Sequence, residues 1–306
     1  MGRRNRRGRA VHGILLLDKP AGMTSNRALQ AVKRLFQARK AGHTGSLDPM
    51  ATGLLPICLG EATKVSAFLL DADKHYRFTV RLGERTDSGD ADGAVLETRG
   101  CAGIDRAAIE AALEPLRGEI EQVPPMHSAV KRGGRPLYEY ARRGESVARE
   151  PRRTRIHRLE LVGFDGRDVE LVVHCAKGTY VRTLAEDLGE ALGCGGHIVA
   201  LRRTGAGPFV DPGMVTLDAL EERAAAEGPE GLDALLQPID AALAEWPRLE
   251  VSREVADFLR QGQAVQVPRA PAGGVLRLYE REGGGFIGMG RIQDDGRVAP
   301  KRLMNL

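Results

Sequence analysis

The segment from Gly42 to Pro56 constrains the fold more than any other, because it can be neither a regular helix nor a regular strand. It holds three glycines, two threonines and two prolines, and it runs into the apolar stretch Leu54–Leu59. Glycine adopts backbone angles that other residues avoid, and Pro49 restricts the preceding Asp48 to extended conformations. The segment therefore predicts a rigid loop that holds one carboxylate, Asp48, against a buried strand. A simple Asp-Pro turn that caps a helix is the alternative.

Apolar periodicity elsewhere predicts helices and strands in an irregular order. Helices are expected from Thr24 or Ser25 onward and over residues 61–70, 107–117, 137–143 and 184–192. Strands are expected over residues 13–18, 54–59 and 76–82, with a hairpin formed by 154–164 and 168–175. Residues 224–231 have the low complexity of a linker. Because strands and helices do not alternate regularly, we expect an α+β fold with a mixed or antiparallel sheet and flanking helices.

The chain divides into three predicted parts. Residues 1–10 carry five arginines and are expected to form a basic, flexible N-terminal tail. Residues 11–246 contain most of the periodic apolar segments and are expected to form the larger domain. After Trp246, short strand candidates separated by glycines indicate that residues 247–306 form a small β-barrel-like module.

Several classes of protein are excluded by composition. The sequence has no run of eighteen apolar residues, so no membrane span is expected. Four scattered cysteines indicate neither a disulfide framework nor a zinc-binding spacing, and they favour a cytoplasmic location. The acidic turn at residues 87–93 resembles a calcium loop, but Ser88 and Arg99 stand where that loop requires carboxylates. Glycine patterns for phosphates or dinucleotides are also missing, and we expect no metal and no cofactor.

Charge is distributed unevenly along the chain. Residues 131–158 carry ten lysines and arginines against three glutamates, whereas residues 211–257 carry twelve acidic residues against three basic ones. A segregated basic face is typical of proteins that bind a polyanion such as RNA. A solvated surface would explain the same charge run.

Motifs along almost the whole chain resemble those of the TruB-type tRNA pseudouridine-55 synthases. The Asp48 loop resembles the nucleophile motif of this family, and the other matches follow in the family's order. They are Gly13–Pro20, Lys74–Tyr76, Gly89–Gly93, Pro124–Lys131, Leu137–Arg142, Cys175–Arg182 and Gly288–Gly290. The resemblance implies that residues 11–246 form the catalytic domain and that residues 247–306 form an RNA-binding module of PUA type.

The resemblance also implies a role for each matching residue. Asp48 would be the nucleophile and Arg182 its ionic partner. Tyr76, Tyr180 and the backbone of Leu201 would form the pocket for the target uracil. His43 would fill the space left by the flipped base, since aromatic stacking offsets the cost of unstacking. The remaining matches have supporting roles: Asp90 hydrogen-bonds near the site, Lys131 makes a phosphate or backbone contact, and Lys19 has a structural role near the pocket entrance.

Taken without the resemblance, these residues have plainer interpretations. Arg182, Lys19 and Lys131 would be surface residues, and Tyr76 and Leu201 would be core residues. The motif also contains one departure, because His127 stands where many relatives carry tyrosine. Asp48 is the only acidic residue that stands out as a catalytic candidate. A single carboxylate fits pseudouridine formation, since this isomerisation needs a nucleophile but no second reactant. Glycoside hydrolysis, by contrast, normally uses two carboxylates.

We therefore expect an enzyme that isomerises uridine 55 in the T-arm of tRNA, acting as a monomer without an obligate protein partner. Two alternatives stay open. The first is a guide-dependent synthase that works within a ribonucleoprotein, which the lack of an extended tail after the last strand candidates disfavours. The second is a tRNA-binding or tRNA-folding factor whose catalysis is dispensable. Attack at C1′ of the ribose and attack at C6 of the base are both compatible with the sequence.

Overall fold

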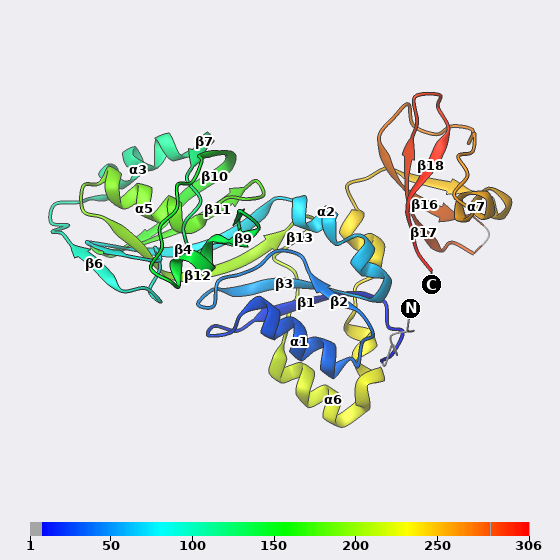
Figure 1. Ribbon diagram of the computed structural model, residues 1–306, viewed down its shortest axis with the longest axis horizontal. Coiled ribbons are helices and arrows are strands. Elements are labelled where there is room, and N and C mark those ends of the chain that lie inside the picture. The colour runs from blue at the N-terminus through cyan, green and yellow to red at the C-terminus, as the bar shows by residue number, and fades with distance from the viewer. Residues whose placement is uncertain (1–7, 282, 306) are drawn as a thin grey trace.

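The computed structural model describes residues 8–281 and 283–305, and its centre is one ten-stranded sheet (Figure 1). Eight strands follow one another across it: β14 (Val215–Thr216), β1 (Gly13–Lys19), β3 (Thr52–Leu59), β12 (Gly196–Ala206), β4 (Lys74–Leu82), β11 (Asp168–Cys175), β10 (Arg152–Phe164) and β7 (Gly118–Gln122). Two short strands join the path from the side, β2 (Ala41–His43) on β3 and β13 (Phe209–Val210) on β12. Two pairings are parallel, β1 with β14 and β12 with β3, so the sheet is mixed.

Helices cover this sheet in two groups. Helix α1 (Ser25–Leu35) and α6 (Leu217–Gly231) pack together near β1 and β3, whereas α5 (Val181–Ala191) and α3 (Arg106–Leu113) lie over β12 and β10 (Figure 1). Smaller elements follow the edges: α2 (Ser66–Asp71), α4 (Leu137–Ala141), and the hairpins β5 (Glu84–Thr86) with β6 (Val95–Thr98) and β8 (Lys131–Arg132) with β9 (Arg135–Pro136). The predicted α+β class is confirmed.

Strands β1 and β3 are buried on both faces, which explains their uninterrupted apolar sequences. Leu15 and Leu17 belong to the main core under α1, whereas Ile14 and Leu16 belong to a second core on the opposite face. Alternation along a strand sends successive side chains to opposite faces, so both sets must be apolar. The carboxylate loop is thus attached to a strand that is buried on both sides.

A second sheet of four strands forms a separate lobe at the C-terminal end (Figure 1). It contains β15 (Arg248–Val251), β16 (Val275–Glu280), β17 (Phe286–Ile292) and β18 (Val298–Leu303), with α7 (Arg253–Arg260) beside it. Its own core includes Val251, Leu259 and Leu278. Met289 and Met304 of this lobe join the core around Ile14, so apolar packing connects the two sheets.

Some local predictions were wrong. The helix expected over 61–70 is a 3₁₀ turn (Gly60–Lys64) followed by α2, and the helix expected to reach Arg117 ends at Leu113 because Pro115 follows. The expected linker at 224–231 lies within α6, which kinks at Gly228. Most of the expected basic tail lies outside the described residues, but Arg9 is held by Asp233 through a hydrogen bond of 2.6 Å.

Gly53 has a packing requirement that generates a stability prediction. Its φ is +94°, and a Cβ atom there would lie 2.3 Å from the carbonyl oxygen of Arg203 on β12. Gly103 has a similar φ of +80° but open space around it, which makes it a matched control. We expect Gly103→Ala to lower the free energy of unfolding by about 1–2 kcal/mol, from backbone strain alone. Gly53→Ala should cost roughly 2 kcal/mol more, from the clash. Equal losses in urea titrations would contradict this.

Candidate active site

Asp48 and Arg182, 134 residues apart in sequence, form a two-point ion pair. Arg182 Nε lies 3.0 Å from Asp48 Oδ2, and Arg182 Nη2 donates to Oδ1 at 3.1 Å. The Arg182 side chain is 6% exposed, whereas that of Asp48 is 33% exposed. A guanidinium that binds both oxygens fixes the plane of a carboxylate. The carboxylate is thus oriented from the protein side and remains accessible from the other.

Arg182 is itself held in place by backbone carbonyls. Its Nη1 donates to Ser88 O at 2.8 Å, and its Nη2 also donates to His127 O at 2.7 Å. Asp90, which is 4% exposed, places its Oδ2 3.7 Å from Arg182 Nε. The predicted neighbours Asp48, Arg182 and Asp90 therefore meet in one cluster. His127 contributes its carbonyl oxygen here, a group that every residue has.

The loop that carries Asp48 is fixed on both sides of the carboxylate. Ser25, at the start of α1, accepts a hydrogen bond from Leu47 N at 2.7 Å and donates one to Leu47 O at 3.1 Å. On the other side, Pro49 O accepts from Gly22 N at 2.8 Å and from Lys19 Nζ at 3.3 Å. The backbone around Asp48 is therefore held by α1 and by the end of β1.

Lys19 is completely buried and serves as a structural donor. Besides Pro49 O, its ammonium group donates to Pro20 O at 2.7 Å and to Met23 O at 2.6 Å. Burial lowers the pKa of Lys19 to about 8, although the charge of Asp48 opposes this change. The residue was expected to have a structural role near the pocket entrance, and it lies inside the protein beneath the Asp48 loop.

A cavity of about 180 Å³ adjoins this loop. Its lining combines the loop with β4, the end of β11 and the segment before α5, through Gly45, Ser46, Leu70, Lys74, Tyr76, Cys175, Ala176, Gly178, Thr179, Tyr180 and Arg203. Both predicted pocket tyrosines, Tyr76 and Tyr180, are among these residues. Burial raises the pKa of the Tyr76 hydroxyl, so it stays protonated at neutral pH.

Tyr180 is positioned by a side chain that the sequence did not reveal. Gln122, at the end of β7, accepts from Tyr180 N at 3.0 Å and donates to Tyr180 O at 3.2 Å. Helix α5 begins at Val181, so Tyr180 precedes the helix and Arg182 is helical. Tyr180 is the cap residue, so it lines the cavity while Arg182 reaches Asp48 from the first helical turn.

Arg203 is a second functional candidate that the sequence reasoning missed. It is 1% exposed, and its guanidinium donates to Leu54 O at 2.6 Å and to Gly45 O at 3.1 Å. It therefore ties β3 and the Asp48 loop to β12 while lining the cavity beside Tyr76. The sequence did contain a clue to this role. Arg203 occupies an inward-facing position of a strand, where alternation predicts an apolar residue.

The other predicted residues lie around this centre. Leu201 is buried on β12, and its carbonyl accepts from Thr52 Oγ1 at 3.4 Å. His43 is in β2, and its buried Nδ1 has no hydrogen-bond partner among the residues that the structure describes. Burial and the charge of Arg203 lower the pKa of His43, so its ring is neutral at pH 7. Neither residue lines the cavity that holds the two tyrosines.

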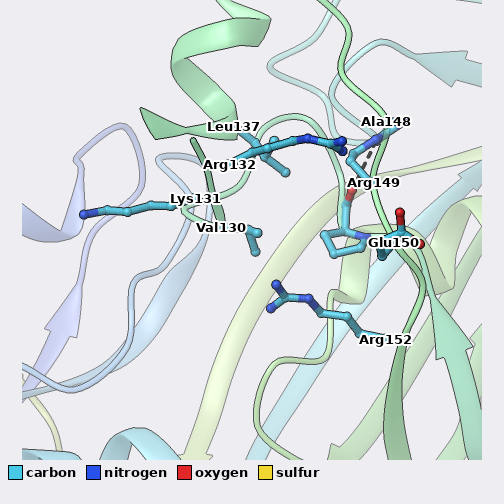
Figure 2. A pocket seen from close by; sticks show the side chains of 9 residues that line it. Val130, Lys131, Arg132, Leu137, Ala148, Arg149, Glu150 and Arg152 are labelled. Carbon is cyan, nitrogen blue, oxygen red and sulfur yellow. Dashed lines mark hydrogen bonds between the residues drawn. The ribbon is translucent and has the colours of Figure 1, made fainter. Parts of the chain in front are cut away.

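Lys131 belongs to a basic region next to a second hollow of about 220 Å³ (Figure 2). Arg132, Arg149 and Arg152 also line it, and Arg149 donates to Pro124 O at 3.1 Å. Figure 2 shows Arg132 pointing toward Ala148, whereas Lys131 points away from the other basic side chains. These guanidinium and ammonium groups form a cationic surface that can bind phosphates.

Comparisons with known proteins identify the class of this site. Family models match residues 33–181 (TruB family pseudouridylate synthase, N-terminal domain), 182–244 (tRNA pseudouridylate synthase B C-terminal domain) and 247–304 (pseudouridine synthase II TruB, C-terminal). By family, the chain is thus a pseudouridine synthase, an isomerase. The chain belongs to the TruB family, as its motifs indicated, and the match over 247–304 agrees with a PUA-like C-terminal module.

Full-length relatives support this assignment. The chain is 53% identical to the tRNA pseudouridine synthase B of Yersinia pestis (strain Pestoides F), covering 99% of this chain and 95% of the relative. It is equally similar to the enzyme of that name from Vibrio vulnificus (strain YJ016), covering 98% of each. Among solved structures, a Cbf5-Nop10-Gar1 complex matches with a TM-score of 0.74 and 26% identity, covering 95% of this chain and 84% of that one.

The Asp48 carboxyl provides a pH prediction. Burial raises its pKa above the ordinary value, and the Arg182 guanidinium opposes that rise. Ionised Asp48 therefore costs stability at neutral pH, and this cost disappears as the pH falls through the folded-state pKa. The carboxyl ¹³C resonance of Asp48 is assigned by its loss in Asp48→Asn. We expect the pKa measured from this resonance to lie above 3.8 in the wild type. It should be higher still in Arg182→Lys, which loses the two-point contact. A pKa below 3.8 in the wild type would contradict this.

Lys19 generates a second prediction at this site. Lys19→Met leaves three carbonyl oxygens without their donor, so the free energy of unfolding should fall by about 2–3 kcal/mol. Turnover should also fall, because the Pro49 carbonyl oxygen next to Asp48 loses one of its two hydrogen bonds. Lys64→Met is the control: Lys64 is partly exposed and donates to one carbonyl, Leu303 O, at 2.7 Å. Denaturant titration and single-turnover assays measure both effects, and similar losses in the two variants would refute the role given to Lys19.

Proposed function

We propose that this protein converts uridine 55 in the T-arm of tRNA to pseudouridine, with Asp48 as the nucleophile. One observation supports this proposal most directly. Arg182 fixes the Asp48 carboxylate at two points and leaves one face exposed, beside a cavity lined by two tyrosines. The proposal is further supported by 53% identity, over nearly the full length, to enzymes named tRNA pseudouridine synthase B. It places the activity in the cytoplasm of the cell, on a monomer without an obligate protein partner.

The reaction breaks the bond between N1 of uracil and C1′ of ribose and forms a bond between C5 and C1′. The proton on C5 leaves, N1 gains a proton, and product and substrate have the same composition. In this proposal the Asp48 carboxylate attacks C1′ or C6 and departs again when the new bond is complete. Arg182 keeps the carboxylate oriented for attack, since its own contacts prevent rotation. No cofactor is required by this chemistry.

The surrounding residues bind the flipped nucleotide. Tyr76 stacks on the uracil, Tyr180 encloses it, and the backbone of Leu201 on neighbouring β12 contacts its edge. The neutral ring of His43 occupies the position that the base leaves, which reduces the cost of unstacking. The basic region with Lys131 and the PUA-like module bind phosphates of the T-arm and its surroundings.

A guide-dependent synthase is the second candidate, because the Cbf5-Nop10-Gar1 structure shares the fold. Identity favours the stand-alone enzyme, at 53% with the tRNA enzymes against 26% with Cbf5. A T-arm transcript incubated with protein alone separates the two, since the guide-dependent type would leave it unmodified. A tRNA-folding factor would bind that transcript without converting it.

The decisive variant is Asp48→Asn, which keeps the shape of the side chain and removes the nucleophile. We expect it to lose conversion of the T-arm uridine, scored by carbodiimide-dependent primer extension, and to keep the RNA affinity of the wild type. Asp92→Asn is the matched control, because Asp92 is an exposed acid in the adjacent turn. Conversion by Asp48→Asn would show that another group is the nucleophile.

A further inference from the structure

Two histidines and an aspartate converge at a place that the proposed reaction does not use. His157 Nε2 lies 3.1 Å from Asp73 Oδ2, and His174 Nε2 lies 3.5 Å from the same oxygen. One ligand-type atom from each of the three residues lies within 4.8 Å of the other two. A fourth side chain, His75, stacks on His174 with ring centroids 4.0 Å apart. No metal was predicted from the sequence, and Asp73, His157 and His174 are too far apart along the chain to form a spacing motif.

The cluster is built on three adjacent strands of the main sheet, β4, β11 and β10. His75 and His174 are direct partners on the adjacent strands β4 and β11, and His157 comes from β10 on the other side of β11. The pairing of β10 with β11 shifts between Ile156 and Arg158, so His157 lies at a β-bulge. Bulges commonly redirect a side chain. Here the bulge turns His157 toward Asp73, which immediately precedes β4.

The spacing of the cluster fits a tetrahedral metal. With metal–ligand bonds of about 2.0–2.1 Å, neighbouring ligand atoms in a tetrahedral zinc site lie roughly 3.3–3.4 Å apart. Two of the three distances between the ligand atoms are close to this value. Asp73 Oδ2 lies 3.1 Å from His157 Nε2 and 3.5 Å from His174 Nε2. Two imidazoles and one carboxylate are also the donors that suit zinc and similar divalent ions. We propose that Asp73, His157 and His174 bind a divalent transition metal of the zinc class.

The site has an open side. Asp73, His75 and His174 line a cavity of about 650 Å³ that also reaches Trp246 and Lys301. A zinc ion with three protein ligands keeps a fourth position for water, and the cavity gives room for it. The metal would connect β10 to the start of β4, across the intervening strand β11. Because His75 and Tyr76 are consecutive on a strand, the metal lies on the opposite face from the uridine pocket.

Hydrogen bonds alone are the competing explanation, since an aspartate can accept from two imidazole N–H groups. Metal binding distinguishes the two. The full-length protein, stripped with a chelator, is titrated with Zn²⁺ in competition with a chromophoric chelator. We expect one equivalent to bind to the wild type. His157→Gln and Asp73→Asn should each weaken that binding roughly tenfold or more. His75→Gln should retain it, because His75 is outside the ligand set.

Two further measurements exclude other causes. Cysteine thiolates also bind zinc, so Co²⁺ is used as a spectroscopic probe: ligand-field bands without a thiolate charge-transfer band are expected. Zn²⁺ should raise the melting temperature of the wild type and leave that of His157→Gln unchanged. Melting in chelator shows that each variant folds, and His157→Gln changes a side chain that is already 31% exposed. Equal Zn²⁺ affinity in wild type and His157→Gln, or a thiolate band, would overturn the proposal.

Discussion

The contact between Asp48 and Arg182 determines the arrangement of the rest of the site. A carboxylate that is partly removed from water needs a charged partner, and the two-point contact supplies one while leaving the outer side accessible. It also joins a loop that follows α1 to a helix that follows β11. The sheet between them must therefore hold β3, β12, β4 and β11 in a fixed order and register, because a slip of one residue would separate the pair.

Buried cations keep the loops of this site rigid. Lys19, Lys74 and Arg203 each donate to backbone carbonyl oxygens at loop or helix ends. Carbonyl oxygens satisfy the hydrogen bonds of a cation without neutralising it, so the charge of Lys19 still interacts with Asp48. Burial correspondingly lowers the pKa of Lys19 and of Lys74 to about 8. The positive surroundings favour an ionised carboxylate even where burial works against it.

Sequence periodicity predicted those parts whose structure is decided locally. Thr24 caps α1, and the hairpin of β10 and β11 follows from alternation around a turn. Arg203 and Gln122 were not predicted, because their roles arise from contacts with segments far away in sequence. The linker expected at 224–231 failed because three consecutive alanines and Glu227 are strong helix formers, and α6 continues through them to the kink at Gly228.

Strand β4 shows how one element can serve two unrelated sites. Lys74 and Tyr76 line the cavity beside the Asp48 loop. His75 between them faces the other cavity together with His174 of β11. Successive side chains of β4 point to opposite faces of the sheet. Substitutions on one face therefore leave the geometry of the other face intact. The face away from Asp48 is therefore free to carry other side chains, and the pairing of β4, β11 and β10 that supports the Asp48 side also positions His157 and His174.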